Sequence, residues 1–251
     1  MEGLSSLSQV CSVLEALVEK QTSGFASGCG SPPPVIVGIS GVPGSGKTTV
    51  VAQLTSMLQG LHGDCWVAAL PMDGFHLPRS ALDKMSDPGR AHARRGSPFT
   101  FDPARLVDCI RNLRADGCGT APGFDHEVGD PEPARILIEA GVRLLIIEGN
   151  YLLLGRLDND QFSEADGTPL SPAWRDVDSE LDASWYLHTD VDVAMERVAQ
   201  RNKNNPGWEM LSISEVRERV AANDRLNAEL VAVSSVHADA VLVIAEDLSK
   251  L

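Results

Sequence analysis

The run GVPGSGKT at residues 41–48 constrains this chain more than any other feature, because it matches the phosphate-binding pattern G-x-x-x-x-G-K-[ST] at every fixed position. The preceding residues Val35–Ser40 (VIVGIS) have the apolar character of a buried strand, and apolar residues recur at helical spacing over Thr48–Leu61. In a strand-loop-helix of this kind, backbone N–H groups surround a polyphosphate and the helix N-terminus adds partial positive charge. The sequence therefore predicts a nucleoside triphosphate site.

Each part of this loop has an expected role. The expected nucleotide contacts are Gly41, Val42, Pro43, Gly44, Ser45, Gly46, Lys47, Thr48 and Thr49. In such loops the lysine reaches the β- and γ-phosphates, and the hydroxyl that follows it binds Mg²⁺. The three glycines permit backbone angles and a close phosphate approach that a Cβ would block. A chance glycine turn is the alternative, and the flanking strand and helix disfavour it.

Composition narrows the class of protein. With 251 residues, 43% of them hydrophobic, the chain can bury a full core, and one α/β domain is expected. A net charge of −14 argues against nucleic acid as a partner, because that binding needs basic surface. The five cysteines contain no C-x-x-C pair, which disfavours a disulfide framework or a zinc site. No apolar stretch approaches the ~20 residues of a membrane span. We expect a cytoplasmic protein without a membrane partner; the sequence leaves its oligomeric state open.

The remaining pattern predicts alternating strands and helices. An amphipathic helix is expected from Leu4 to Val18, followed by a linker over Gln21–Pro34 that is rich in glycine, serine and proline. We divide the chain into residues 1–30, this helix and linker, and residues 31–251, the phosphate-loop domain. Further strands are expected at Cys65–Pro71, Arg135–Ile138, Arg143–Ile147, Ala183–His188 and Ala238–Ile244, and further helices at Pro103–Ala115, Asp190–Asn202 and Ser212–Val231.

This alternation predicts a doubly wound, mainly parallel sheet with ligands at the carboxyl ends of its strands. Residues 77–102 are polar, locally basic and interrupted by prolines, so we expect a long excursion over the sheet with a functional role. Residues 155–180 are acidic and have no regular pattern, so they predict neither a structural element nor a functional role.

Two carboxylates stand at the ends of predicted strands. Asp73 follows the strand after the phosphate loop, and Glu148 ends the apolar run Leu144–Ile147. Phosphoryl transfer to a hydroxyl needs a carboxylate that orients the acceptor and takes its proton, and an acidic residue at such a strand end holds Mg²⁺. We expect Asp73 to be the catalytic base, and Thr48, Asp73 and Glu148 to lie around the metal. Ordinary strand-end carboxylates in solvent are the alternative.

Two arginines lie one helical turn apart in the helix predicted after the strand Ala183–His188. Arg197 and Arg201 have i,i+4 spacing, so they share a face of this helix. Two guanidinium groups beside a flexible segment suit a lid that closes over the γ-phosphate and spreads the charge of the transition state. A surface helix with solvated charges is the alternative.

Together these motifs resemble the uridine kinase, phosphoribulokinase and pantothenate kinase group of P-loop kinases, over nearly the whole chain after residue 30. The shared segments are GVPGSGKTT, MDGFH around Asp73, TFD at 100–102, Phe124-Asp125, Glu148-Gly149 and a TD-x-D-x-x-x-x-R-x-x-x-R stretch from Thr189. MDGFH, R-R-G-S-P-x-T-F-D and EGNYLLL match a less characterised branch that is often described only as kinase-like. The resemblance implies a three-layer α/β/α kinase with a lid, in which Asp73 is the base, Lys47 and Thr48 bind phosphate and metal, and Glu148 supports metal or water.

The same resemblance implies an acceptor site formed by His76, Arg94, Arg95, Asp102 and Asp125. The adjacent arginines would clamp a carboxylate or phosphate of the acceptor, and the two aspartates would accept hydrogen bonds from sugar-like hydroxyls. Alternatively, Asp102 caps the next helix and the arginines belong to a solvated loop. Uridine kinases place a tyrosine and a histidine where this chain has Phe124 and Gly129, which disfavours uridine because its polar groups would be left unpaired.

The leading hypothesis is a kinase that uses ATP and Mg²⁺ to phosphorylate a hydroxyl of a small sugar-, nucleoside- or pantothenate-like metabolite. The alternative is a nucleotide-binding regulatory protein or NTPase switch without small-molecule phosphotransfer. A guanine-reading Asn-Lys-x-Asp is missing, since the nearest match, residues 202–205, ends in Asn205. The sequence does not identify the acceptor.

Overall fold

A parallel sheet forms the centre of the computed structural model, which describes residues 3–23, 32–125, 128–164, 166–204, 208 and 210–244. Within these residues its six strands follow the order β1 (Gly3–Leu4), β8 (Ala240–Leu242), β7 (Ala183–Leu187), β2 (Val35–Ser40), β6 (Leu144–Gly149) and β3 (Val67–Pro71). All neighbouring strands are parallel. Ser40 at the end of β2 lies opposite Gly149 of β6 and Tyr186 of β7, so the carboxyl ends of the central strands are level.

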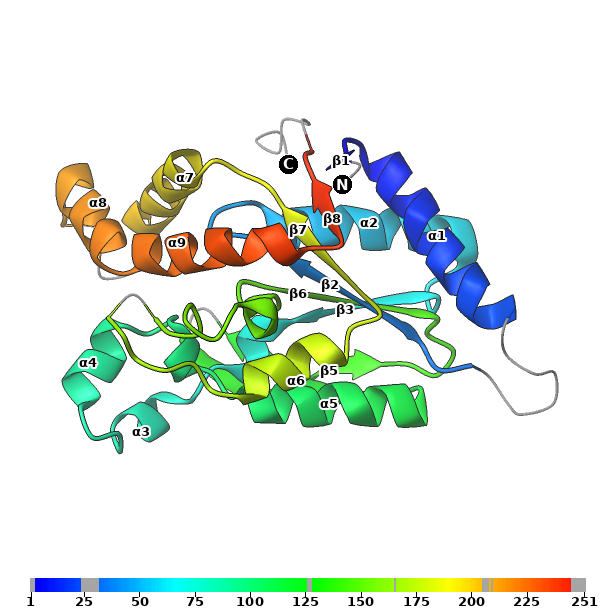
Figure 1. Cartoon of the computed structure of the whole chain (residues 1–251), viewed down its shortest axis with the longest axis horizontal. Coiled ribbons are helices and arrows are strands. Elements are labelled where there is room, and N and C mark those ends of the chain that lie inside the picture. The colour runs from blue at the N-terminus through cyan, green and yellow to red at the C-terminus, as the bar shows by residue number, and fades with distance from the viewer. Residues whose placement is uncertain are drawn as a thin grey trace.

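Helices cover both faces of the sheet. On one face lie α1 (Leu7–Ser23) and α2 (Lys47–His62), and on the other lie α5 (Pro103–Asp116) and α6 (Ala173–Ser179), as Figure 1 shows. The predicted three-layer α/β/α architecture is confirmed. No described helix is long and apolar enough to span a bilayer.

The central strands are buried on both faces, which explains their continuous apolar sequences. Val37 of β2 and Ile146 of β6 pack in the core shared with α1 and α2, whereas their neighbours Ile36 and Leu145 pack in the core on the opposite face. Successive side chains of a strand point to opposite faces, so a strand between two cores has no polar side.

The N-terminal segment belongs to the same packed unit. Leu4 lies in β1 and pairs with Leu242 of β8, so the predicted start of the first helix at Leu4 is wrong and α1 begins at Leu7. Val10 and Leu14 of α1 are fully buried. The division of the chain at residue 30 stays a prediction, and most of the expected linker lies outside the described residues.

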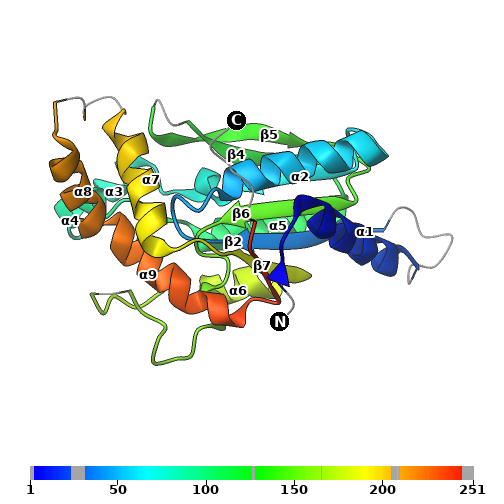
Figure 2. The ribbon, with the colours of Figure 1, turned by 90° about the horizontal axis from the view of Figure 1, so that it is seen from above.

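Three helices lie at the carboxyl end of the sheet: α7 (Val191–Lys203), α8 (Ile213–Ala222) and α9 (Asp224–Ser234). The prediction of a single helix over Ser212–Val231 is wrong, because the helix is interrupted at Asn223. The side chain and carbonyl of Asn223 bond to residues 94 and 95 instead of continuing the helix, a competition typical of asparagine. Figures 1 and 2 both place these helices at the same end as α3 (Arg79–Leu82) and α4 (Pro88–Ala93).

A separate antiparallel hairpin, β4 (Gly119–Asp125) and β5 (Asp130–Ile138), packs on the 3-10 helix η1 (Met72–Phe75). The strand expected at 135–138 is therefore part of a hairpin and not of the main sheet, and β4 was missed. The glycines and proline of β4 (GTAPGFD) disfavour a strand on propensity alone. The expected loop at 77–102 contains α3, α4 and η2 (Pro98–Thr100), and further 3-10 turns are η3 (Leu154–Arg156) and η4 (Ser235–His237).

The core beneath α2 supports the phosphate loop, and its contribution to the free energy of unfolding can be measured. Leu54 is completely buried on α2, while Leu61 on the same helix is 65% exposed. Leu54→Ala is expected to lower the free energy of unfolding by about 2–5 kcal/mol, since it removes buried methyl groups and leaves a cavity. Leu61→Ala is the matched control and should change it by no more than about 0.5 kcal/mol. Urea denaturation measures both, and equal effects would contradict the packing described.

Candidate functional site

Residues 41–46 connect β2 to α2 in a loop whose backbone requires glycine. Gly44 has φ +80° and Gly46 has φ +91°, both in the region that L residues rarely adopt. Gly41 is needed for space, because a Cβ there would lie 2.9 Å from the carbonyl oxygen of Leu187. The Ser45 hydroxyl is buried and has no hydrogen-bond partner among the described residues. An unpartnered buried donor in this loop fits a phosphate oxygen.

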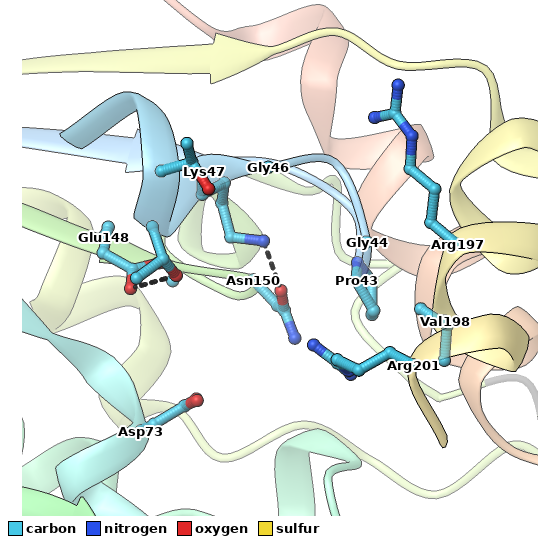
Figure 3. A pocket seen from close by; sticks show the side chains of 13 residues that line it. Pro43, Gly44, Gly46, Lys47, Asp73, Glu148, Asn150, Arg197, Val198 and Arg201 are labelled. Carbon is cyan, nitrogen blue, oxygen red and sulfur yellow. Dashed lines mark hydrogen bonds between the residues drawn. The ribbon is translucent and has the colours of Figure 1, made fainter. Parts of the chain in front are cut away.

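A cavity of about 290 Å³ opens beside the loop. It is lined by Asp73, Glu148, Asn150, Arg197 and Arg201 together with loop and helix residues Pro43, Gly44 and Gly46–Thr49 (Figure 3). The remaining expected nucleotide contacts, Gly41, Val42 and Ser45, form the inner part of the loop. The structure therefore brings the phosphate loop, both predicted carboxylates and both predicted arginines to one cavity.

The position of Asp73 depends on a close backbone contact. Asp73 lies in η1, directly after β3, and η1 packs against the end of β6. A Cβ at Gly149 would lie 2.5 Å from the Cβ of Met72, so only glycine permits this approach. The contact puts Asp73 on the opposite side of the cavity from the phosphate loop (Figure 3).

Lys47 is buried at the base of the cavity. Its Nζ donates to the carbonyl oxygens of Gly41 (2.8 Å) and Val42 (3.1 Å) and to Oδ1 of Asn150 (2.8 Å). Burial lowers the pKa of Lys47 from 10.5 to about 8, although the charges of Glu148 and Asp73 oppose this shift. Sequence reasoning missed Asn150; the signal available was its place directly after Glu148-Gly149.

Thr48 and Glu148 form the second polar contact of the site. The Thr48 hydroxyl donates to Oε1 of Glu148 at 2.9 Å. Burial raises the pKa of Glu148, and the nearby Asp73 carboxylate adds to the rise, while Lys47 and the hydrogen bond from Thr48 oppose it. A hydroxyl and two carboxylates are the oxygen ligands that Mg²⁺ prefers, and Mg²⁺ usually takes only one or two protein carboxylates. These residues fit a magnesium ion.

Arg197 and Arg201 reach the cavity from α7. Figure 3 shows the Arg201 guanidinium extending toward Asn150, with Arg197 one turn away on the same helix. Within the described part of the chain neither guanidinium has a carboxylate partner within ion-pair distance. Asp224 at the start of α9 is mostly buried, which raises its pKa, and the charges of Arg201 and Arg94 oppose that rise.

The predicted acceptor residues lie outside the lining of this cavity. Arg94 donates to Oδ1 of Asn223 (2.7 Å) and of Asn227 (3.2 Å), and Arg95 forms an ion pair with Asp130 (2.8 Å). Both arginines are therefore bound by the protein itself instead of lying in a solvated loop. Their role toward the acceptor stays a prediction.

The other three acceptor candidates also have protein partners. Asp102 accepts from the backbone N–H of Arg105 at 3.0 Å, so it caps α5, as the alternative interpretation expects. Asp125 accepts from the N–H of Val128 and pairs with Arg135. His76 bonds through Nδ1 to the carbonyl oxygen of Asp73 at 2.8 Å, and its ring packs at a tilt against the rings of Phe101 and Phe124. This bond ties His76 directly to Asp73, and the backbone N–H of Asp102 donates to the carbonyl oxygen of Phe75 in the same 3-10 helix at 2.8 Å.

Comparison with known proteins agrees with this geometry. Residues 36–227 match the model of the Phosphoribulokinase / Uridine kinase family. The chain is 35% identical over 210 residues to the "Putative uridine kinase C227.14" of Schizosaccharomyces pombe, which covers 83% of this chain and 82% of that protein. It is 32% identical over 243 residues to the ATP-dependent kinase YFH7 of Lachancea thermotolerans, covering 84% of this chain and 65% of that protein. The solved structure of YFH7 from Saccharomyces cerevisiae shares the fold, with a TM-score of 0.72, 20% identity and coverage of 96% and 99%.

The low pKa of Lys47 predicts how stability depends on pH. Between about pH 8 and pH 10 the unfolded chain keeps a proton on Lys47 that the folded protein has lost, so the cost of burying the charge disappears as pH rises. Relative to Lys47→Met, the free energy of unfolding of the wild type should therefore rise by about 1.4 kcal/mol per pH unit in this window. Urea denaturation at several pH values measures the difference, with the exposed Lys20→Met as control. A difference that does not vary with pH would contradict the prediction.

Proposed function

Since this chain belongs to the Phosphoribulokinase / Uridine kinase family, it is a P-loop small-molecule kinase that uses ATP, and we propose that it phosphorylates a hydroxyl group of a sugar-, nucleoside- or pantothenate-like metabolite. The observation that carries this proposal is the single cavity that Asp73 shares with the phosphate loop. Transfer to an alcohol requires a carboxylate that takes the hydroxyl proton, and Asp73 is the candidate for that role.

In the proposed reaction Asp73 accepts a hydrogen bond from the acceptor hydroxyl and aligns its oxygen with the γ-phosphorus. That oxygen forms the new bond to phosphorus while the bond to the β–γ bridging oxygen breaks and ADP leaves, and Asp73 takes the hydroxyl proton. Lys47 donates to the β- and γ-phosphates, and Arg197 and Arg201 neutralise charge on the transferring group. Catalysis then rests on positioning and charge neutralisation.

The metal is part of the proposal. Thr48, Asp73 and Glu148 would hold Mg²⁺ directly or through water, since their oxygens face one cavity. When bound, Mg²⁺ supplies charge neutralisation to the phosphate oxygens. Burial raises the pKa of Glu148, and the cation would hold this carboxyl group in its ionised form.

The acceptor is proposed only as a chemical class. The name of the fission yeast relative includes uridine kinase, but this chain lacks the tyrosine and histidine that pair with uridine, having Phe124 and Gly129 instead. We propose that the acceptor hydroxyl lies beside Asp73 and that His76, which bonds to the carbonyl oxygen of Asp73, contributes to its binding. Asp102 and Asp125 would contribute by sharing or exchanging their present partners. An anionic acceptor would use Arg94 and Arg95 only by replacing their present partners. The net charge of −14 favours a small molecule over nucleic acid.

Replacement of the proposed base tests the reaction. Asp73→Asn is expected to lower kcat by about 10²–10⁴-fold, because the amide cannot take the proton, while ATP affinity stays nearly intact. A ³¹P-NMR or mass-spectrometric screen of ATP-dependent phosphorylation over a metabolite extract identifies the acceptor, with the Asp73→Asn protein as the blank. Asp64→Asn, at an exposed position, is the matched control.

Two outcomes would contradict the proposal in different ways. Equal loss of ATP binding and turnover in Asp73→Asn would indicate a structural role for this carboxylate. Retained ATP binding by the wild type with no transfer to any metabolite would favour a nucleotide-binding regulatory protein.

The metal assignment has its own test. Glu148→Gln is expected to raise the Mg²⁺ concentration needed for half-maximal activity by about 10- to 100-fold, because a neutral amide holds the cation or its water less tightly. Titration of activity with Mg²⁺ at saturating ATP measures this shift. The exposed Glu19→Gln should leave the titration unchanged. An unchanged Mg²⁺ requirement in Glu148→Gln would remove this residue from the metal site.

A further inference from the structure

Asn150 lines the cavity, and sequence analysis assigned it no role. It directly follows β6, and its carbonyl oxygen accepts from the hydroxyl of Ser40, the last residue of β2, at 2.8 Å. Ser40 is completely buried. This bond fixes the backbone of Asn150 where the two central strands end, so its side chain enters the cavity from a rigid position.

The amide of Asn150 has a defined orientation. Lys47 Nζ can only donate, so the atom that faces it at 2.8 Å is the amide oxygen. The Nδ2 group must then point in the other direction, and Figure 3 shows it facing the guanidinium of Arg201 across the cavity. Two groups that only donate face each other there. An acceptor atom between them would satisfy both.

The hydrogen bonds of Lys47 point to the same acceptor. An ammonium has three N–H groups, and here they bond to the carbonyl oxygens of Gly41 and Val42 and to Asn150. A phosphate can bind Lys47 only if one of these partners gives way. The two carbonyls belong to the backbone of the phosphate loop, whereas the amide of Asn150 is on a rotatable side chain, so Asn150 is the partner that can yield.

We propose that Asn150 binds the γ-phosphoryl group of ATP through Nδ2, opposite Arg201, and orients Lys47 through Oδ1 until the nucleotide arrives. This inference rests on the proposed function, because it assumes that a triphosphate occupies the cavity. It adds a neutral donor to the charged groups that surround the transferring phosphoryl.

The test compares a nucleotide that carries a γ-phosphoryl group with one that lacks it. Calorimetric titration with Mg²⁺ and either ADP or the non-hydrolysable imidodiphosphate analogue of ATP needs no acceptor and no turnover. Wild type, Asn150→Ala, Asn150→Asp and the exposed control Asn112→Asp are measured. Asn150→Asp is nearly isosteric and keeps an oxygen for Lys47, so it remains informative if the alanine variant unfolds.

The proposal expects a selective loss of the γ-phosphoryl contact. In Asn150→Ala the preference for the triphosphate analogue over ADP should fall roughly 10- to 100-fold, the value of a hydrogen bond to a charged group. Asn150→Asp should lose at least as much, because a carboxylate repels the phosphate, and Asn112→Asp should match the wild type. Once the acceptor is known, kcat of both Asn150 variants should fall with little change in the KM for the acceptor.

Two results would overturn the assignment. If both Asn150 variants kept the wild-type preference for the triphosphate analogue over ADP, the amide would not contact the γ-phosphoryl group. A loss in Asn150→Ala with full retention in Asn150→Asp would mean that Asn150 acts only through Lys47. Failure of the wild type to bind either nucleotide would instead overturn the proposed function itself.

Discussion

The register between β2 and β6 is the constraint on which the site depends. Ser40 lies opposite Gly149, and the Ser40 hydroxyl bonds to the carbonyl of Asn150, so the phosphate loop and the polar residues after β6 start from the same level of the sheet. In a parallel sheet a slip of one residue would turn every side chain of the strand to the opposite face. Here such a slip would bring apolar residues to the position of Glu148. The double core on either side of these strands prevents it.

The cavity brings together charges that stabilise one another only in part. Burial lowers the pKa of Lys47 to about 8, although the charges of Glu148 and Asp73 oppose this shift. Glu148 shows the converse, a carboxylate whose pKa is raised by burial despite the nearby lysine. A metal-bound triphosphate would supply the missing charges of both signs, with phosphate oxygens near Lys47 and the arginines and a cation near the carboxylates.

Much of this arrangement could be predicted from the sequence, because local rules determine it. The phosphate loop, the apolar strands Val35–Ser40 and Leu144–Gly149, and the strand-end positions of Asp73 and Glu148 follow from spacing and periodicity. Asn150 could not be predicted, since its role depends on a lysine 103 residues away. Strand β4 was missed because its glycines and proline disfavour a strand, whereas the backbone of Pro122 and Gly123 packs closely on Gly74 of η1, a tertiary contact that overrides propensity.

The segment around Arg94 and Arg95 shows why the remaining contacts could not be predicted from sequence patterns. Asn223, where the predicted helix breaks, donates to the carbonyl of Arg95 and accepts from Arg94, 129 residues away in sequence. The buried Ser97 hydroxyl donates to Asn227, on the first turns of α9. These bonds join residues 94–97 and the start of α9 into one structural unit. Arg94 and Arg95, which sequence analysis assigned to the acceptor, therefore bond to the residue at which the helix is interrupted. The arrangement of residues 94–97 is consequently set by pairs of residues far apart in the sequence, and no local motif encodes such pairs.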